Sequence, residues 1–170
     1  SRLRHEWAWA SSDRESFQMV PIVANGVMFI NEHKPGEGRV VALDAVSGDV
    51  LWTYSRDYPA AVTAVASRGV IVYEDKVYWA SADSAMVALD ARTGEEIWET
   101  QAADPRDPRV GGYTSPPIVV EGKVIAGNAE GDMGGRGRLD AFDAETGEIL
   151  WQVHTTPDED EPGYETWGTA

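Results

Sequence analysis

The sequence contains no cysteine, and only 14 of its 170 residues are lysine or arginine, against 29 aspartate and glutamate residues. Without thiols the chain forms no disulfide, thiolate metal site or cysteine nucleophile. The formal net charge of −15 argues against nucleic acid or an anionic membrane surface as a partner, because both are bound through clusters of basic side chains. No apolar run is long enough to span a bilayer, and no stretch has the form of a signal peptide. No segment keeps a helical period, which excludes solenoids of paired helices.

One eleven-residue motif occurs three times, at residues 42–52, 88–98 and 141–151. Each copy has Ala, Asp, Thr or Ser, Gly and Trp at the same five places. The final tryptophans, Trp52, Trp98 and Trp151, lie 46 and 53 residues apart. Five matched positions in all three copies argue against three unrelated hairpins. The spacing predicts repeated supersecondary units.

The chemistry of the motif predicts a hairpin with a tight turn. The Asp carboxylate accepts hydrogen bonds from backbone N–H groups two or three residues further on, with help from Thr or Ser. The Gly supplies a positive φ at the end of the turn. The outgoing strand ends in a Trp, which we expect to pack between neighbouring units with its indole N–H bonded to a backbone carbonyl.

Each repeat contains four strand-like segments, which is the pattern of a β-propeller blade. We therefore predict an all-β chain with three four-stranded antiparallel blades at residues 17–54, 67–100 and 115–152. Residues 5–10 are expected to be the last strand of a preceding blade. A closed ring needs about four blades or more. We accordingly expect residues 1–170 to be a partial propeller whose remainder lies outside this sequence.

The repeated Ala-x-Asp-x-x-Thr-Gly-x-x-x-Trp resembles the tryptophan-docking motif of the quinoprotein alcohol dehydrogenases, eight-bladed propellers that use pyrroloquinoline quinone (PQQ). The resemblance covers essentially the whole chain. It implies oxidation of a small alcohol to an aldehyde or ketone, a calcium or lanthanide ion beside the quinone, and an electron acceptor such as a cytochrome c or a quinone. It also implies a periplasmic location. The alternative is a cofactor-free propeller scaffold that binds protein partners, as in bacterial outer-membrane assembly.

The glycine-rich segment 127–137 resembles the family signature Gly-Ala-Glu-Phe-Gly-Val-Arg-Gly, whose acidic residue ligates the metal. Counting back from Arg136 and Gly137 places Asp132 at the ligand position. Asp is shorter than Glu by about 1.5 Å, so the metal distance or denticity is expected to differ. The resemblance implies that the preceding residues Ala129, Glu130 and Gly131 bring backbone groups to the cofactor. The alternative is a glycine-rich turn with an exposed acid.

Three further segments carry the resemblance. Residues 113–120 resemble the stretch whose Thr hydrogen-bonds the quinone, which implies Thr114. Residues 66–69 resemble the family's Val-Asn-Arg-Gly, which implies that Arg68 binds the quinone oxygens. A fixed guanidinium there would stabilise the charge that develops on reduction. The alternative for Arg68 is a surface position beside a blade. Gln18 takes the place of a Glu that contacts the quinone.

The sequence also departs from the family pattern. Val62 and Thr63 stand where many members have a vicinal disulfide against one face of the quinone. The resemblance places the catalytic base, an Asn metal ligand and the Trp that stacks on the quinone further along than this sequence extends. We therefore name no catalytic residue and expect the isolated chain to be inactive.

Overall fold

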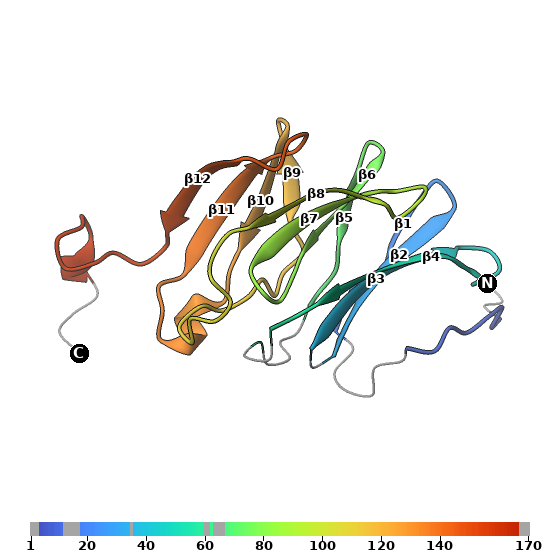
Figure 1. Cartoon of the computed structure of the whole chain (residues 1–170), viewed down its shortest axis with the longest axis horizontal. Coiled ribbons are helices and arrows are strands. Elements are labelled where there is room, and N and C mark those ends of the chain that lie inside the picture. Colours follow the sequence, from blue (N-terminus) through green and yellow to red (C-terminus); the bar gives the residue numbers. More distant parts are fainter. Residues whose placement is uncertain (1–3, 12–17, 35, 60–61, 63–66, 167–170) are drawn as a thin grey trace.

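The computed structural model describes residues 4–11, 18–34, 36–59, 62 and 67–166. These residues form three four-stranded antiparallel sheets, each with its strands in chain order (Figure 1). The first sheet contains β1 (Ile22–Ala24), β2 (Val27–Lys34), β3 (Glu37–Asp44) and β4 (Val50–Asp57). The second contains β5 (Ile71–Tyr73), β6 (Lys76–Ala80), β7 (Ala85–Asp90) and β8 (Glu96–Gln101). The third contains β9 (Ile118–Val120), β10 (Lys123–Gly127), β11 (Arg138–Asp143) and β12 (Ile149–His154).

The predicted all-β propeller architecture is confirmed. Within the described ranges the only helices are the short 3₁₀ segments η1 (Glu130–Met133) and η2 (Tyr164–Thr166). Neither has the length or the apolar character to cross a membrane. The first strands of neighbouring sheets approach each other, β1 beside β5 and β5 beside β9, as the inner strands of propeller blades do.

The repeated motif builds the same turn in each sheet. In the second copy, Asp90 Oδ1 accepts hydrogen bonds from the backbone N–H groups of Arg92 (2.9 Å) and Thr93 (2.7 Å) and from the Thr93 hydroxyl (3.0 Å). Gly94 follows with a φ of 75°. The carboxylates of Asp44 and Asp143 accept the equivalent backbone bonds in the first and third copies.

Tryptophan side chains join each sheet to the next. The Trp52 indole N–H donates to the Ala91 carbonyl of the second sheet (3.1 Å), and the Trp98 indole N–H donates to the Ala144 carbonyl of the third (3.1 Å). Each ring lies flat against the glycine of the next motif. A Cβ added to Gly94 would lie 2.6 Å from the Trp52 ring, and one added to Gly147 would lie 2.6 Å from the Trp98 ring. Both tryptophans therefore occupy sheet boundaries, as predicted.

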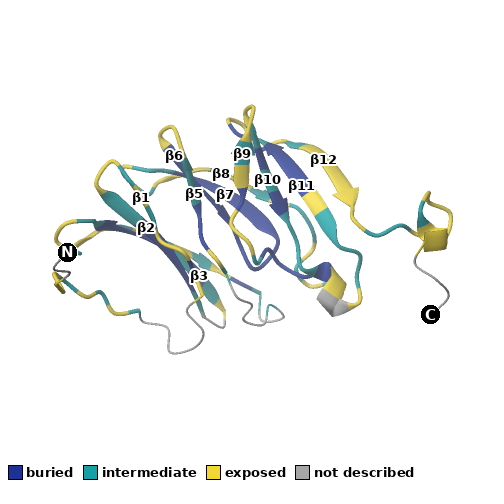
Figure 2. Cartoon of the chain, turned by 180° about the vertical axis from the view of Figure 1, so that it is seen from behind, coloured by how far each residue is buried: buried dark blue, intermediate teal, exposed yellow. Residues whose placement is uncertain are grey.

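The third motif tryptophan differs from this expectation. Trp151 is 37% exposed, together with other apolar side chains of β12. Figure 2 shows β12 as an exposed strand, whereas β6 and β7 of the middle sheet are buried. The physical reason is that no sheet within the described residues covers β12, while the middle sheet is covered on both faces.

Residues 4–11 have no strand assignment, although 5–10 were expected to form one. A strand is defined by its hydrogen-bonded neighbour, and these residues pair with no strand of the described chain. Trp7 nevertheless lies against Gly48, with ring atoms 2.6 Å from the position of an added Cβ. It thus makes the packing contact that Trp52 and Trp98 make in the next two sheets.

The apolar core lies between the sheets. One cluster fills the space between the first and second sheets and includes Phe29, Val40 and Trp79. A second cluster fills the space between the second and third sheets and includes Tyr78, Trp98 and Phe142. The large buried side chains therefore fix the spacing of the sheets, and with it the relative positions of the loops at their two ends.

The two ends of the sheets carry different segments of the repeat. At one end, here called the motif end, each motif turn is hydrogen-bonded to the first hairpin turn of its sheet. These turns are residues 44–48, 90–94 and 143–147. Because the strands are antiparallel, the inner strands β1, β5 and β9 begin at the opposite end, where β10 also ends. That opposite end carries every residue for which the sequence predicted a cofactor or metal role.

Candidate functional site

Arg68 and Thr114 meet at the opposite end of the sheets. Arg68 precedes β5 and Thr114 precedes β9, and the Arg68 Nη1 donates a hydrogen bond to the Thr114 carbonyl (3.1 Å). Arg68 is exposed and Thr114 is partly exposed. Because a guanidinium carries five N–H donors, this bond orients Arg68 without exhausting its capacity to bind a ligand.

The segment that precedes β1 joins them. The Val20 N–H donates to the Arg68 carbonyl (3.1 Å), which brings the neighbourhood of Gln18 to the same place. Gly69, with a φ of 141°, lies between these segments, because an added Cβ would be 3.2 Å from the Val20 carbonyl oxygen and 3.7 Å from Pro116. The Gln18 side chain is exposed. The three segments leading into the inner strands are therefore in direct contact.

The η1 segment is held beside Thr114 by backbone contacts. Tyr113 forms an isolated β-bridge with Asn128, and the Ala129 N–H donates to the Gly112 carbonyl (3.1 Å). The backbone of Asp132 lies in η1, at the same end as Thr114. Its side chain lies outside the described part of the structure, so its metal role stays a prediction.

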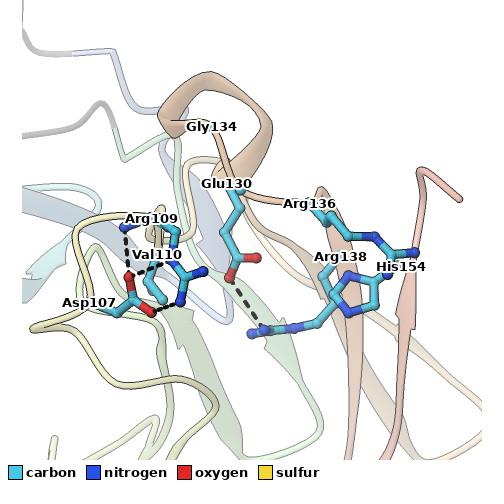
Figure 3. A pocket seen from close by; sticks show the side chains of 9 residues that line it. Asp107, Arg109, Val110, Glu130, Gly134, Arg136, Arg138 and His154 are labelled. Carbon is cyan, nitrogen blue, oxygen red and sulfur yellow. Dashed lines mark hydrogen bonds and ion pairs between the residues drawn. The ribbon is translucent and has the colours of Figure 1, made fainter. Parts of the chain in front are cut away.

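The residues before Asp132 have different environments. Gly131 is exposed and Ala129 is partly exposed, so their backbone is accessible at the surface of η1. Glu130, by contrast, is 6% exposed and points toward Arg138, whose Nη1 lies 3.3 Å from the Glu130 Oε1 (Figure 3). Burial raises the pKa of Glu130, and the Arg138 charge partly opposes this shift. The structure therefore places the Glu130 carboxylate in an ion pair.

A cavity of about 280 Å³ opens next to this ion pair. Figure 3 shows charged side chains around it, several of them paired with one another. Its charged lining residues are Asp107, Arg109, Glu130, Arg136 and Arg138, and the His154 imidazole also lines it. The chain, which is strongly acidic as a whole, thus gathers basic groups around η1.

Val62 and Thr63 stand where many members of the predicted family have a vicinal disulfide, and only Val62 is among the described residues. Its N–H donates to the Pro59 carbonyl (2.9 Å), and its side chain packs against the core between the first and second sheets. Thr63 lies outside the described residues.

The polar groups at this end fit a polar, anionic cofactor better than a metal alone. Near Arg68 and η1, the buried atoms Asn31 Oδ1 and Asn128 Nδ2 have no hydrogen-bond partner among the described residues, whereas Glu130 Oε1 faces the Arg138 guanidinium. Buried polar atoms are normally satisfied, so such atoms indicate capacity for a ligand or water. The Arg68 guanidinium and the Thr114 hydroxyl are hydrogen-bond donors that reach the surface at this end. Across the described side chains, no group of three or more His, Asp or Glu residues could hold a metal ion.

The sequence did not predict the buried polar side chains next to η1, which are Arg138, Asp140 and Tyr113. Arg138 donates to Asp140 through Nε (2.6 Å) and Nη2 (3.1 Å), and the Tyr113 hydroxyl donates to the same carboxylate. Burial and the Asp140 charge raise the pKa of Tyr113, which keeps it a protonated donor. The available signals were the position of Tyr113 directly before Thr114 and the same-face spacing of Arg138 and Asp140 on one strand.

The fold and its tryptophan-linked sheets define the class of protein as a β-propeller. The chain belongs to the PQQ family of glucose/ethanol/alcohol dehydrogenase β-propeller domains, whose family model matches residues 1–170. The predicted family resemblance is therefore confirmed.

Individual relatives agree with this assignment. The quinohemoprotein alcohol dehydrogenase ADH IIB of Pseudomonas putida is 37% identical over 165 residues, 94% of this chain and 23% of that protein. A 1-butanol dehydrogenase (cytochrome c) of Thauera butanivorans is 37% identical over 143 residues, 81% of this chain and 20% of that protein. The solved structure of a europium-containing methanol dehydrogenase matches 83% of this chain and 25% of its own length, with a TM-score of 0.73 and 29% identity. The chain thus spans a fifth to a quarter of the length of these relatives.

Proposed function

We propose that this chain forms part of a PQQ-dependent dehydrogenase that oxidises an alcohol to an aldehyde or ketone. The observation that carries the proposal is the contact of Arg68 with Thr114 beside η1, at the end of the sheets where the inner strands begin. The names of the relatives, all alcohol dehydrogenases, support the reaction class.

The described residues supply the polar side of such a site. A bound quinone would supply the oxidant, taking up the two electrons and two protons that an alcohol loses when it becomes an aldehyde or ketone. In this proposal Arg68 would donate to the quinone oxygens and would stabilise negative charge there on reduction. The Thr114 hydroxyl supplies a second donor, and the exposed backbone at Ala129 and Gly131 supplies further polar groups. Gln18 adds an amide, which donates or accepts but carries no charge.

A metal ion beside the quinone is a further part of the proposal. Asp132 would supply one ligand, and calcium takes six to eight oxygen ligands, so the remaining ligands must come from other groups. The name of the europium-containing relative supports a lanthanide, and calcium is the alternative. We further propose a cytochrome c or a quinone as the electron acceptor and a periplasmic location. The name of the butanol dehydrogenase supports the cytochrome.

The test uses the whole protein, supplied with PQQ and either calcium or a lanthanide, in a dye-linked alcohol oxidation assay. Arg68→Gln should lower kcat/KM at least about a hundredfold, as loss of one stabilising donor typically does. The matched control is Arg92→Gln, because Arg92 is also exposed but lies in a motif turn at the other end. Equal activity of the two variants would contradict the role of Arg68. Absence of quinone binding by the wild-type protein would contradict the function itself.

A further inference from the structure

A buried series of polar side chains connects η1 to the segment that carries Thr114. It consists of Glu130, Arg138, Asp140 and Tyr113 and is called here the Arg138 network. Arg138 Nη1 lies 3.3 Å from Glu130 Oε1, while its Nε and Nη2 donate to Asp140. The exposed fractions of the Glu130, Arg138 and Asp140 side chains are 8%, 11% and 0%, and Tyr113 is fully buried.

One backbone hydrogen bond and one bond to the Asn128 side chain close the loop that this network spans. The Asn128 N–H donates to the Arg138 carbonyl (3.0 Å), and the Asn128 Oδ1 accepts from the Arg138 N–H (2.9 Å). Within the loop, the Gly135 N–H donates to the Glu130 carbonyl (3.0 Å). The loop is thus fixed at its base by Asn128 and Arg138, and the side chain of Arg138 reaches its interior at Glu130.

Only an arginine can make all of these contacts from one position. Its planar fork offers two parallel donors to Asp140 and a further nitrogen to Glu130, whereas a lysine ammonium offers one point charge. Asp140 is also held by the Tyr113 hydroxyl and by the Gln152 amide (3.0 Å). The Asp140 carboxylate therefore has a fixed position on β11, and its hydrogen bonds orient the side chains of Arg138 and Tyr113.

The energetics favour a positioning role over a purely stabilising one. Buried ion pairs contribute little net stability relative to apolar packing of similar volume, because desolvation offsets their attraction. What such a network adds is a defined geometry for the groups that it joins. Here those groups are η1, which carries the expected metal ligand Asp132, and Tyr113, whose neighbour Thr114 accepts the hydrogen bond of Arg68.

We propose that Arg138, Asp140 and Tyr113 are positioning residues that fix η1 relative to Thr114, and so set the geometry of the metal and quinone contacts. The proposal rests on the proposed function. It assigns to these residues no contact with the quinone. Partners that orient metal ligands typically change metal affinity about 10- to 100-fold when they are lost.

The experiment compares two buried tyrosines in the whole protein. Tyr113→Phe removes only the hydroxyl that bonds Asp140. Tyr78→Phe is the matched control, because Tyr78 is also fully buried but donates to the Ala144 carbonyl at the motif end (3.0 Å). Arg138→Lys tests the fork, since it keeps the charge and loses the bidentate geometry.

The first readout is amide hydrogen exchange over residues 128–138 in protein without cofactor. Exchange should accelerate in Tyr113→Phe and Arg138→Lys and stay at the wild-type rate in Tyr78→Phe. The second readout is the calcium or lanthanide concentration that gives half-maximal PQQ binding. It should rise about tenfold or more in the two network variants, beyond any change in the control. A merely structural role would lower the melting temperature of both tyrosine variants without separating them in these two readouts.

The possible failures are distinguishable. If the wild-type protein binds PQQ and the two tyrosine variants behave alike in exchange and in metal dependence, the positioning role is wrong and the proposed function stands. If the wild-type protein binds no PQQ with either metal, the proposed function is wrong, and the positioning role falls with it.

Discussion

Replacing Gly147 by alanine tests how the sheets are joined. In the third motif turn, Gly147 has a φ of 74°, and an added Cβ would lie 2.6 Å from the Trp98 ring and 2.9 Å from the Thr100 hydroxyl oxygen. The methyl group must therefore displace the indole, whose N–H bond to Ala144 holds the second sheet against the third. Gly147→Ala should weaken the sheet boundary as well as strain the turn.

Gly122→Ala provides the matched control and allows the magnitude to be worked out. Gly122 has almost the same φ, 72°, but an added Cβ would meet nothing within 4 Å. Both variants incur the left-handed backbone strain of about 1–2 kcal/mol, and both change the unfolded chain alike. Only Gly147→Ala adds overpacking, which typically costs about 1–3 kcal/mol. The difference between the two variants should therefore be about 1–3 kcal/mol.

The assay is equilibrium urea unfolding followed by tryptophan fluorescence, with the free energy of unfolding compared at a common slope. The Gly147→Ala spectrum should also shift to the red, because Trp98 is displaced toward solvent. A difference below about 0.5 kcal/mol between the two alanine variants would refute the claim that the ring-on-glycine contact joins the sheets.

Three other predictions concern the tryptophans, acid stability and the isolated chain. In the isolated 170 residues, Trp98→Ala should lower the free energy of unfolding by about 3–5 kcal/mol, as buried aromatic truncations do. In the same chain Trp151→Ala should cost less than about 1 kcal/mol, because that ring is 37% exposed there. Equal losses in urea titrations would contradict this. Hydrogen bonds from Thr93 and Arg92 lower the pKa of Asp90 against an opposing effect of burial. The stabilisation is therefore present above the unfolded pKa of about 3.9 and is lost as the pH falls through the lower folded value. Asp90→Asn should flatten the fall in urea midpoint between about pH 5 and pH 2, and an unchanged profile would exclude Asp90 as a cause. The isolated 170 residues should bind PQQ weakly in calorimetric titration and should give no alcohol turnover. The reason is that the chain offers few metal ligands and no assigned catalytic base. Turnover would contradict the assignment of residues to the site.

The sheets and their junctions could be predicted from the sequence because the motif carries local and tertiary information together. The Asp and Gly dictate the turn. The Trp follows that turn at a fixed spacing in the sequence, and it must bury a large ring whose N–H needs a hydrogen-bond acceptor. Trp52 and Trp98 satisfied both demands. Trp151 did not, because its burial depends on a neighbouring sheet and no local pattern supplies one.

The site was predictable only in part. The repeat predicts the order and direction of the four strands in each sheet. Because Arg68 and Thr114 each precede the first strand of a sheet, that order places both at the same end. Their roles toward a quinone stay predictions. The pairing of Glu130 with Arg138 could not be predicted, because it depends on how the 128–138 loop closes on itself. Strand pairing of residues 5–10 failed for a similar reason, since a strand needs a partner that local sequence does not reveal.

The central claim is that the end of the sheets where β1, β5 and β9 begin forms one side of a quinone site. A crystal structure of the whole protein grown with PQQ and calcium or a lanthanide tests it most directly. The account predicts density for the quinone at that end, with Arg68 and Thr114 within hydrogen-bond distance of its oxygens and a metal peak beside Asp132. Quinone bound at the motif end, or a quinone that contacts neither Arg68 nor Thr114, would contradict it.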